Sequence, residues 1–343
     1  MKKIAINGLG RVGRLILRRY IEGGYRNFSI VAINDPMPLH NLHYLLKYDS
    51  VHGPLQREVS ITDHTLCVDD QSFALYDKPD AESLPWDEPK IDFVLECSGQ
   101  YRHHNRVMQH IKAGAERVVL TAPSGDADIT LVMGVNEDNF DPEQHIIISN
   151  ASCTTNCLAP VLKILMDDFG VERALVTTVH SYTASQSMVD VAADKPHRGR
   201  AGALNIIPTT TGADACTMLV LPELKDRVMA LALRVPVANV ALIDISAELS
   251  CDVTKDAIND AFKKASRGAM RDIIEYSDEQ LVSSDIIGNS YSAVIHGQAT
   301  RVLQSNMVNI FAWYDNEYAY ACRCLDLIEK LSYQPLKVEP IIV

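Results

Sequence analysis

Short apolar runs alternate with amphipathic segments over the first 150 residues of the chain. The runs are rich in Ile and Val and are bounded by turn-forming residues, which indicates buried strands, whereas the segments between them repeat apolar residues at helical spacing. This alternation predicts a mostly parallel, doubly wound α/β sheet. The predicted strands are 2–7, 28–35, short pieces within 57–75, 91–99, 117–125 and 145–150, and the predicted helices are 15–24, 39–49 and 103–113.

The pattern changes after Cys153, which predicts a domain boundary there. Between the later elements, residues 183–205 form a long polar segment without helical or strand periodicity. Because structureless loops of this length are uncommon inside a compact domain, we expect this loop to take part in the function of the protein. The elements predicted in this half are a helix at 154–170, strands with partial alternation at 173–183, 229–237, 240–249 and 309–316, and a last helix at 317–331.

The composition fits a globular protein of two domains, since the 343 residues are 47% hydrophobic and 22% charged. A net charge of −12 argues against general binding to nucleic acid or to a membrane surface. An anionic ligand would therefore need a local cluster of arginines and backbone N–H groups. Eight scattered cysteines, no secretory signal and no apolar run of about 18 residues lead us to expect a cytoplasmic protein with reduced thiols.

Gly8, Gly10 and Gly13 form a G-x-G-x-x-G motif between the first predicted strand and the first helix. Glycines there permit a tight turn and let the backbone and the helix N-terminus approach a pyrophosphate. Asp35 ends the next strand, where a carboxylate can accept hydrogen bonds from ribose hydroxyls and repel a 2′-phosphate. The alternatives are an ordinary glycine-rich turn and an ordinary strand end, but the βαβ context favours a dinucleotide site that prefers NAD to NADP.

The stretch "SNASCTTNCLAP", residues 149–160, contains two cysteines four positions apart. A zinc site needs about four ligands, usually as two spaced pairs, and no second pair lies nearby; a C-x-x-C redox pair is also absent. Cys153 falls at the start of a predicted helix, where the helix dipole favours a reactive thiolate. Cys157 lies one turn further among apolar residues and is predicted to be a small buried side chain.

A thiol nucleophile also needs a base, and His180 is the candidate because it ends the strand that follows the helix. A helix, a turn and a returning strand can bring its imidazole back to Cys153. We expect the two to form a thiolate–imidazolium pair in part at neutral pH. A histidine at a strand end is otherwise more often structural, so its role depends on this pairing.

Motifs spread over nearly the whole chain resemble the phosphorylating glyceraldehyde-3-phosphate dehydrogenases. In order, they are "INGLGRVGR", "AIND", "ECSG", "SNASCTTNCLAP", "HSYTASQ", "NIIPTTTGA", "LRVPVANV" and "WYDNEYAY". The resemblance implies oxidation of glyceraldehyde 3-phosphate with NAD and inorganic phosphate to 1,3-bisphosphoglycerate. It also implies a thioester on Cys153, with His180 as the base.

The same resemblance implies a set of binding residues and no metal. Asn316 would hold the nicotinamide carboxamide, and one anion pocket for the substrate phosphate would contain Thr183 and Arg234. The implied cofactor contacts are Gly8, Gly10, Arg11, Val12, Gly13, Asp35, Ser98, Thr121 and Asn316, and the implied pocket for inorganic phosphate comprises Ser152, Thr154, Arg198, Thr211 and Gly212.

The resemblance further implies two domains and a homotetramer. Residues 1–152 would form a Rossmann-type NAD-binding domain completed by the helix 317–332, and residues 153–316 an α+β catalytic domain with a mixed or antiparallel sheet. The loop 181–206 would lie at a subunit contact.

Two alternatives remain from the sequence. "SLPW" and "HGQATRV" are similar to the erythrose-4-phosphate dehydrogenase branch, although "HSYT" and "TTTG", which that branch usually loses, are both present. A catalytically inactive nucleotide-binding relative is the other alternative, against which the intact pair of Cys153 and His180 argues.

Overall fold

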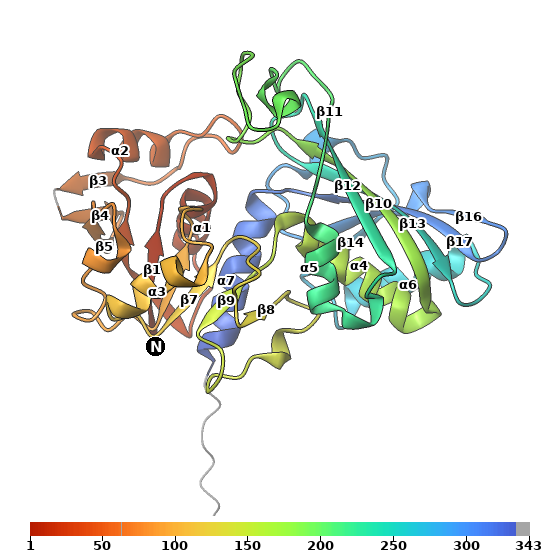
Figure 1. The fold of residues 1–343 in the computed structure, drawn as a ribbon, viewed down its shortest axis with the longest axis horizontal. Coiled ribbons are helices and arrows are strands. Elements are labelled where there is room, and N and C mark those ends of the chain that lie inside the picture. Colours follow the sequence, from red (N-terminus) through yellow and green to blue (C-terminus); the bar gives the residue numbers. More distant parts are fainter. Residues whose placement is uncertain (63, 334–343) are drawn as a thin grey trace, which may run out of the picture.

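The computed structural model describes residues 1–62 and 64–333 and contains two sheets, with the last helix running between them (Figure 1). The first sheet has the strand order β3-β4-β5-β2-β1-β6-β7-β9-β8, and it is parallel apart from the β3-β4-β5 meander. Its strands are β1 (Lys2–Asn7), β2 (Phe28–Asn34), β3 (Val59–Thr62), β4 (Thr65–Val68), β5 (Gln71–Tyr76), β6 (Phe93–Glu96), β7 (Arg117–Leu120), β8 (Ile129–Thr130) and β9 (Ile147–Ser149). Its helices are α1 (Arg11–Ile21), α2 (Leu39–Lys47) and α3 (His104–Lys112).

The sheet is doubly wound around β1, as predicted. From β1 the chain moves to β2 on one side and later returns to β6 on the other, so the strand order reverses between β1 and β6. Ligands of open α/β sheets bind beside such a reversal, at the carboxyl ends of the strands. Asn7, Asn34 and Glu96 are the last residues of β1, β2 and β6 and pair in register there.

The second sheet is mixed, with the order β11-β12-β10-β13-β17-β15-β14, and β16 is paired to β17. In Figure 1 the helices α4, α5 and α6 lie against it. The elements are α4 (Cys153–Phe169), β10 (Val171–Ser181), β11 (Ile207–Thr209), α5 (Ala213–Val220), β12 (Val228–Val235), β13 (Ala241–Leu249), α6 (Lys255–Arg267), β14 (Ile274–Ser277), β15 (Ala293–His296), β16 (Arg301–Leu303), β17 (Met307–Tyr314) and α7 (Tyr318–Ser332). Short 3-10 helices cover η1 (Ala81–Ser83), η2 (Glu137–Asn139), η3 (Pro196–Gly199), η4 (Pro222–Leu224), η5 (Ser283–Ile286) and η6 (Gly297–Ala299).

Each sheet has its own hydrophobic core. Helix α4 packs Cys157, Leu158 and Leu162 against the apolar face of the second sheet. Helix α7 packs instead on the first sheet with α1, and Leu325 is buried with Ile4 in that core. The last helix of the chain therefore packs against the N-terminal half.

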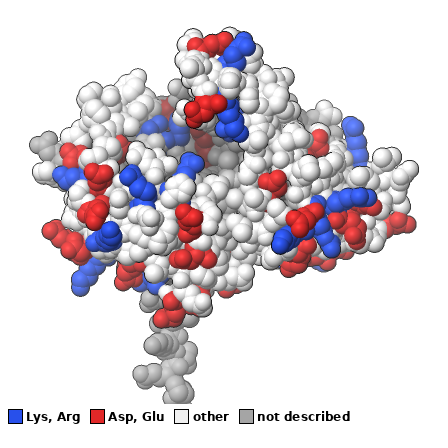
Figure 2. Space-filling view, viewed as in Figure 1, with Lys and Arg blue, Asp and Glu red and all other residues white. Residues whose placement is uncertain are grey.

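The predicted long loop is present between β10 and β11, and apart from η3 it has no helix or strand. In Figure 1 it rises above the space between the two halves, and Figure 2 shows the surface hollowed beneath it. Within the described part of the chain, no helix is both long and apolar enough to cross a bilayer.

Candidate active site

Cys153 is the first residue of α4 and follows a tight turn from β9. The Ser152 hydroxyl caps the helix by accepting the Thr155 N–H at 3.1 Å. Ala151 before it has φ of 51°, an uncommon conformation for alanine, and the Tyr320 hydroxyl donates to its carbonyl at 3.1 Å. This strand–turn–helix arrangement leaves the thiol at the helix N-terminus, as the sequence predicts.

His180 lies near the end of β10 with its Nε2 3.6 Å from the Sγ of Cys153. On the neighbouring parallel strand β12, Arg234 stands in register with it. The Nδ1 of His180 lies 2.8 Å from the Ser181 carbonyl oxygen, to which the Arg234 guanidinium also donates at 2.9 Å. The fold thus brings together the predicted nucleophile, the predicted base and one predicted phosphate ligand.

The pKa shifts run against the predicted thiolate–imidazolium pair. Burial, together with the positive charge of Arg234, lowers the pKa of His180 to about 3. Burial also raises the pKa of the Cys153 thiol, and the opposing effect of Arg234 is smaller. Both directions favour a neutral imidazole facing a thiol, because the buried site disfavours both charges.

Cys157 is fully buried inside α4, as predicted, and burial raises its pKa well above the usual range. It belongs to the core of the second sheet rather than to a site. Among the described residues, no three His, Cys, Asp or Glu side chains gather as metal ligands.

A pocket of about 410 Å³ opens beside the thiol. Asn316, just before α7, reaches it with its amide held by the buried Ser181 hydroxyl, which donates to Asn316 Oδ1 at 2.9 Å. Predicted site residues that line it are Arg11, Val12, Thr121, Ser152, Cys153, His180, Thr183, Arg234 and Asn316.

A second pocket of about 220 Å³ lies at the reversal of the first sheet and is lined by Gly8, Gly10, Asp35 and Ser98. Gly8 has φ of 97°, and a Cβ there would lie 2.6 Å from the Ser98 backbone nitrogen. Gly13 is equally restricted, because its Cβ would lie 2.0 Å from the Gly8 carbonyl oxygen. The turn therefore needs these two glycines for its own packing, whereas the space around Gly10 is open.

Two predicted cofactor residues are tied to protein groups. The Asp35 carboxylate accepts the N–H groups of Leu9 at 2.6 Å and Met37 at 2.8 Å. The Arg11 guanidinium is held by Glu317 and Asp49. Burial raises the pKa of Asp49, but hydrogen bonds from two backbone N–H groups and from Arg11 outweigh that effect and lower the pKa to about 2. Because two carboxylates neutralise Arg11, it can offer a phosphate its backbone N–H but little positive charge.

The predicted inorganic-phosphate residues are only partly brought together. Ser152 lines the pocket of Cys153, but the Thr154 hydroxyl is buried and bonded to the Tyr314 hydroxyl at 2.9 Å. The Thr154 hydroxyl is therefore occupied within the protein, and only the backbone N–H of this residue can serve the predicted phosphate contact. The others lie around the start of α5: Arg198 donates to Thr209 Oγ1 at 2.7 Å, Thr211 accepts the Ala213 N–H at 3.2 Å, and Gly212 precedes the helix.

Several pocket residues were missed by sequence reasoning. Asn7 and Asn34 line the nucleotide pocket, and their place as polar residues at the carboxyl ends of two strands was a usable signal. Glu317 and Tyr320 line the pocket of Cys153. The sequence pattern does not reveal Glu317 and Tyr320 as pocket residues, because the start of α7 is far from Cys153 along the chain.

Known proteins resemble the chain along almost its whole length. Residues 2–104 match the family model described as the NAD binding domain of glyceraldehyde 3-phosphate dehydrogenase, and residues 152–316 match that of its C-terminal domain. Glyceraldehyde-3-phosphate dehydrogenase 2 of Bacillus subtilis is 47% identical over 96% of both chains. The enzymes so named from Geobacillus stearothermophilus (44%; 97% of this chain and 99% of the relative) and Chlamydia muridarum (45%; 96% and 98%) are similar over comparable lengths. The chain therefore belongs to the glyceraldehyde-3-phosphate dehydrogenase family of NAD-dependent oxidoreductases.

Proposed function

We propose that the protein oxidises glyceraldehyde 3-phosphate with NAD and inorganic phosphate to 1,3-bisphosphoglycerate, through a thioester on Cys153. The observation that carries this proposal is the 3.6 Å approach of His180 Nε2 to Cys153 Sγ in a pocket that also contains Thr183, Arg234 and Asn316. A nucleophile, a base and an anion ligand in one pocket match the needs of a phosphorylated aldehyde.

The first proposed step is attack by Cys153 sulfur on the aldehyde carbon. A C–S bond forms, His180 Nε2 takes the thiol proton, and the former carbonyl oxygen becomes an alkoxide. The backbone N–H of Cys153, among the first of α4, has no partner within the helix and can donate to that oxygen. For Nε2 to accept, the ring proton must lie on Nδ1, where the Ser181 carbonyl, 2.8 Å away, can accept it. The Arg234 guanidinium, which also contacts Nδ1, must then direct its N–H to that carbonyl, to which it already donates at 2.9 Å.

The nicotinamide ring of NAD would supply the hydride acceptor for the second step, in which the alkoxide re-forms a C=O bond as hydride leaves the same carbon, so that a thioester remains on Cys153. Asn316 positions the ring, because Ser181 occupies its carbonyl oxygen and leaves the amide N–H groups for the carboxamide. A phosphate oxygen then attacks the thioester carbon, the C–S bond breaks, and the sulfur leaves as the thiolate or takes back a proton.

The chain's residues fit NAD at the pocket of the first sheet. Helix α1 has no side-chain cap and no acidic residue in its first turn, so its free N–H groups can meet a pyrophosphate. Asp35 lies in the same pocket as a carboxylate for ribose hydroxyls. We propose that residues 1–152 with the helix 317–332 form the NAD-binding domain and residues 153–316 the catalytic domain, which the separate cores support.

Thr183 and Arg234 are proposed to bind the substrate phosphate, and Ser152, Arg198, Thr211 and Gly212 the inorganic phosphate. The backbone N–H of Thr154 remains available, although its hydroxyl does not. We also propose a cytoplasmic location, which all eight free cysteines support.

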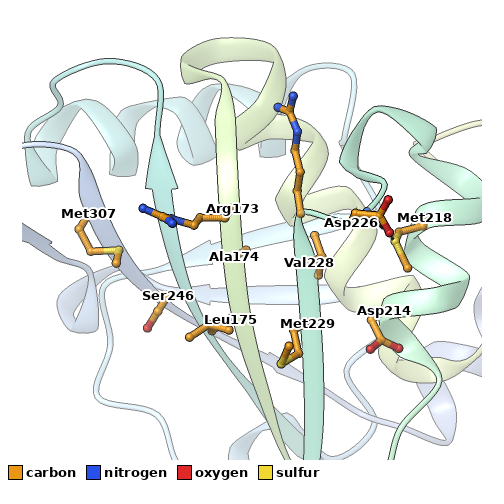
Figure 3. A pocket seen from close by; sticks show the side chains of 11 residues that line it. Arg173, Ala174, Leu175, Asp214, Met218, Asp226, Val228, Met229, Ser246 and Met307 are labelled. Atoms are coloured by element: carbon orange, nitrogen blue, oxygen red, sulfur yellow. Dashed lines mark hydrogen bonds between the residues drawn. The ribbon is translucent and has the colours of Figure 1, made fainter.

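A homotetramer is proposed from two separate apolar surfaces. On the second sheet, Leu175 and Met229 are 63% and 65% exposed on neighbouring strands and line a hollow of about 620 Å³ (Figure 3). On the long loop and just after it, Leu204 and Ile206 are 80% and 68% exposed. Apolar patches of this kind mark interaction sites, and two different twofold interfaces together generate a tetramer.

The deciding experiment compares NAD reduction with glyceraldehyde 3-phosphate and with erythrose 4-phosphate, each with and without inorganic phosphate. Fast, phosphate-dependent reduction with the three-carbon substrate is expected. A preference for the four-carbon substrate would instead favour the erythrose-4-phosphate branch, and no reduction with either would indicate an inactive relative.

A further inference from the structure

A buried carboxylate stands directly behind the nucleotide pocket. Glu96 ends β6 and is 3% exposed. Its Oε1 accepts the backbone N–H of Ser98 at 2.7 Å and the Ser98 hydroxyl at 2.5 Å, and its Oε2 accepts the amide of Asn7 at 2.5 Å. In the described chain its one basic partner at ion-pair distance is His110, at 3.1 Å. Glu96 is therefore an acceptor surrounded by donors, the arrangement that an ionised carboxylate requires.

The protonation of His110 follows from its other neighbour. The indole N–H of Trp86, which can only donate, points at His110 Nδ1 across 3.1 Å. Nδ1 must therefore accept, and the single proton of a neutral ring lies on Nε2, facing Glu96. An imidazolium would place two donors against each other. The cluster thus holds one negative charge, fixed by hydrogen bonds rather than by a cation.

This geometry determines what the Ser98 hydroxyl can offer a ligand. A hydroxyl has one donor and two acceptor positions. The proton of Ser98 is committed to Glu96, and one lone pair accepts the Gln100 N–H at 3.2 Å. Only one acceptor position remains toward the pocket, so Ser98 can accept from a ribose hydroxyl or an amino group but cannot donate to a phosphate oxygen.

We propose that Glu96 is a positioning residue for cofactor selection: by holding the Ser98 proton, it makes Ser98 an acceptor of cofactor hydroxyl or amino groups and disfavours the 2′-phosphate of NADP. The inference rests on Ser98 as a cofactor contact, as proposed above. It adds a second acceptor to the pocket that Asp35 also lines. Ser98 and Asp35 would act together, since both accept hydrogen bonds and an ionised phosphate has no hydrogen to donate.

The variant Glu96→Gln tests this directly. The amide NH2 of the new glutamine must face either Asn7 and His110, which are both donors, or Ser98. The second orientation opposes only one fixed donor, the Ser98 backbone N–H, because the Ser98 hydroxyl can rotate to accept; it is therefore favoured over the first, and the serine proton is freed. Roughly 5- to 100-fold weaker NAD binding is expected, which corresponds to the loss of a buried hydrogen-bond partner. The ratio of NADP to NAD affinity should rise.

A double-mutant cycle separates positioning from general damage. Dissociation constants of NAD and NADP are measured by calorimetry for the parent, Glu96→Gln, Ser98→Ala and the double variant. If Glu96 acts through Ser98, its substitution has little further effect on either cofactor once the hydroxyl is gone. An equal effect of Glu96→Gln in both backgrounds would overturn the proposal.

Two further variants keep the test decisive. Trp86→Phe removes a donor from the far side of the same cluster and should lower the melting temperature while leaving the NADP to NAD ratio unchanged. If Glu96→Gln does not fold, Ser98→Ala should still weaken NAD binding, and Ser98→Thr, which keeps the hydroxyl, should restore it. Normal NAD affinity in Ser98→Ala would refute this inference but not the dehydrogenase function, which the turnover assay measures separately.

Discussion

Arg234 stands in register with His180 on the neighbouring parallel strand, and its guanidinium contacts the imidazole Nδ1. Burial, together with the fixed positive charge beside the ring, keeps the imidazole neutral and lowers the pKa of His180 to about 3. A neutral imidazole is the form that can accept a proton. The arrangement therefore does not suit the cationic half of an ion pair. The neutral ring can serve as the proposed base, and Arg234, the proposed phosphate ligand, also lowers the pKa of that base.

The first prediction concerns the reactivity of the thiol. Because burial raises the pKa of Cys153 and His180 is neutral, alkylation of the unliganded enzyme by iodoacetamide should increase steadily as pH rises above neutrality. His180→Asn should leave this profile nearly unchanged, yet slow acylation by roughly 10²- to 10⁴-fold through loss of the base. A reactive plateau near pH 6 that disappears in His180→Asn would show that the ion pair exists after all.

The second prediction follows from the same pKa through linkage. The unfolded ring binds a proton near pH 6.5, whereas the folded ring binds one near pH 3. The depressed pKa of this base means that stability is complete above about pH 6.5 and falls as the pH drops toward 3, with a slope of up to about 1.4 kcal/mol per pH unit. Urea unfolding of the parent and of His180→Asn should show a shallower acid dependence for the variant. Identical slopes would contradict the assignment.

The third prediction separates the two cysteines of α4. Cys153→Ser should abolish turnover, since a hydroxyl is a far weaker acid than a thiol and is much harder for His180 to deprotonate, and it should leave NAD binding intact. Cys157→Ala should lower the free energy of unfolding by about 1 kcal/mol, because that side chain is wholly buried, with kcat nearly unchanged. Loss of turnover in Cys157→Ala, without unfolding, would mean that the nucleophile has been assigned to the wrong thiol.

Local chemistry made the first half of the fold predictable. The strand–glycine turn–helix unit, Asp35 at its strand end and Cys153 at a helix start all follow from short patterns, and the structure places them as expected. Helix α6 carried readable signals that were not used, namely the cap of Thr254 onto Ala257 N–H and a strongly amphipathic face. Helix α5 is only eight residues long, with too little periodicity to identify.

The charge states of the site residues could not be predicted from the sequence, because they depend on packing between distant elements. The helix dipole favoured a thiolate at Cys153, but burial outweighs it in the folded site. The pairing of Arg11 with Glu317 was equally hidden, as it joins α1 to the turn before α7 across most of the chain. Glu96 and His110 are visible in the sequence, but only the fold shows that Glu96 contacts Ser98 and that His110 contacts Trp86.

The fourth prediction tests Asp35. Asp35→Ala should weaken NAD binding and raise the NADP to NAD ratio, because the carboxylate no longer repels a 2′-phosphate. The variant should also lose about 1–3 kcal/mol of stability, since the N–H groups of Leu9 and Met37 lose their acceptor. Asp35→Asn is the matched control, which removes the charge but keeps one acceptor and should fold better. An unchanged cofactor ratio in both variants, measured by steady-state kinetics, would exclude this role.

The last prediction concerns assembly. Leu175 and Met229 lie side by side on β10 and β12 and are exposed in the single chain (Figure 3). If a second copy covers them, a charge there becomes buried without a partner, which is costly. Leu175→Asp with Met229→Asp should therefore convert a tetramer into a smaller species in sedimentation at micromolar concentration. Val282→Asp, at an exposed site outside both apolar surfaces, should not. Because the long loop forms the other surface, the product should be a dimer held by that loop, and a monomer would mean that the two interfaces are coupled. A parent chain that sediments as a monomer would refute the assembly itself.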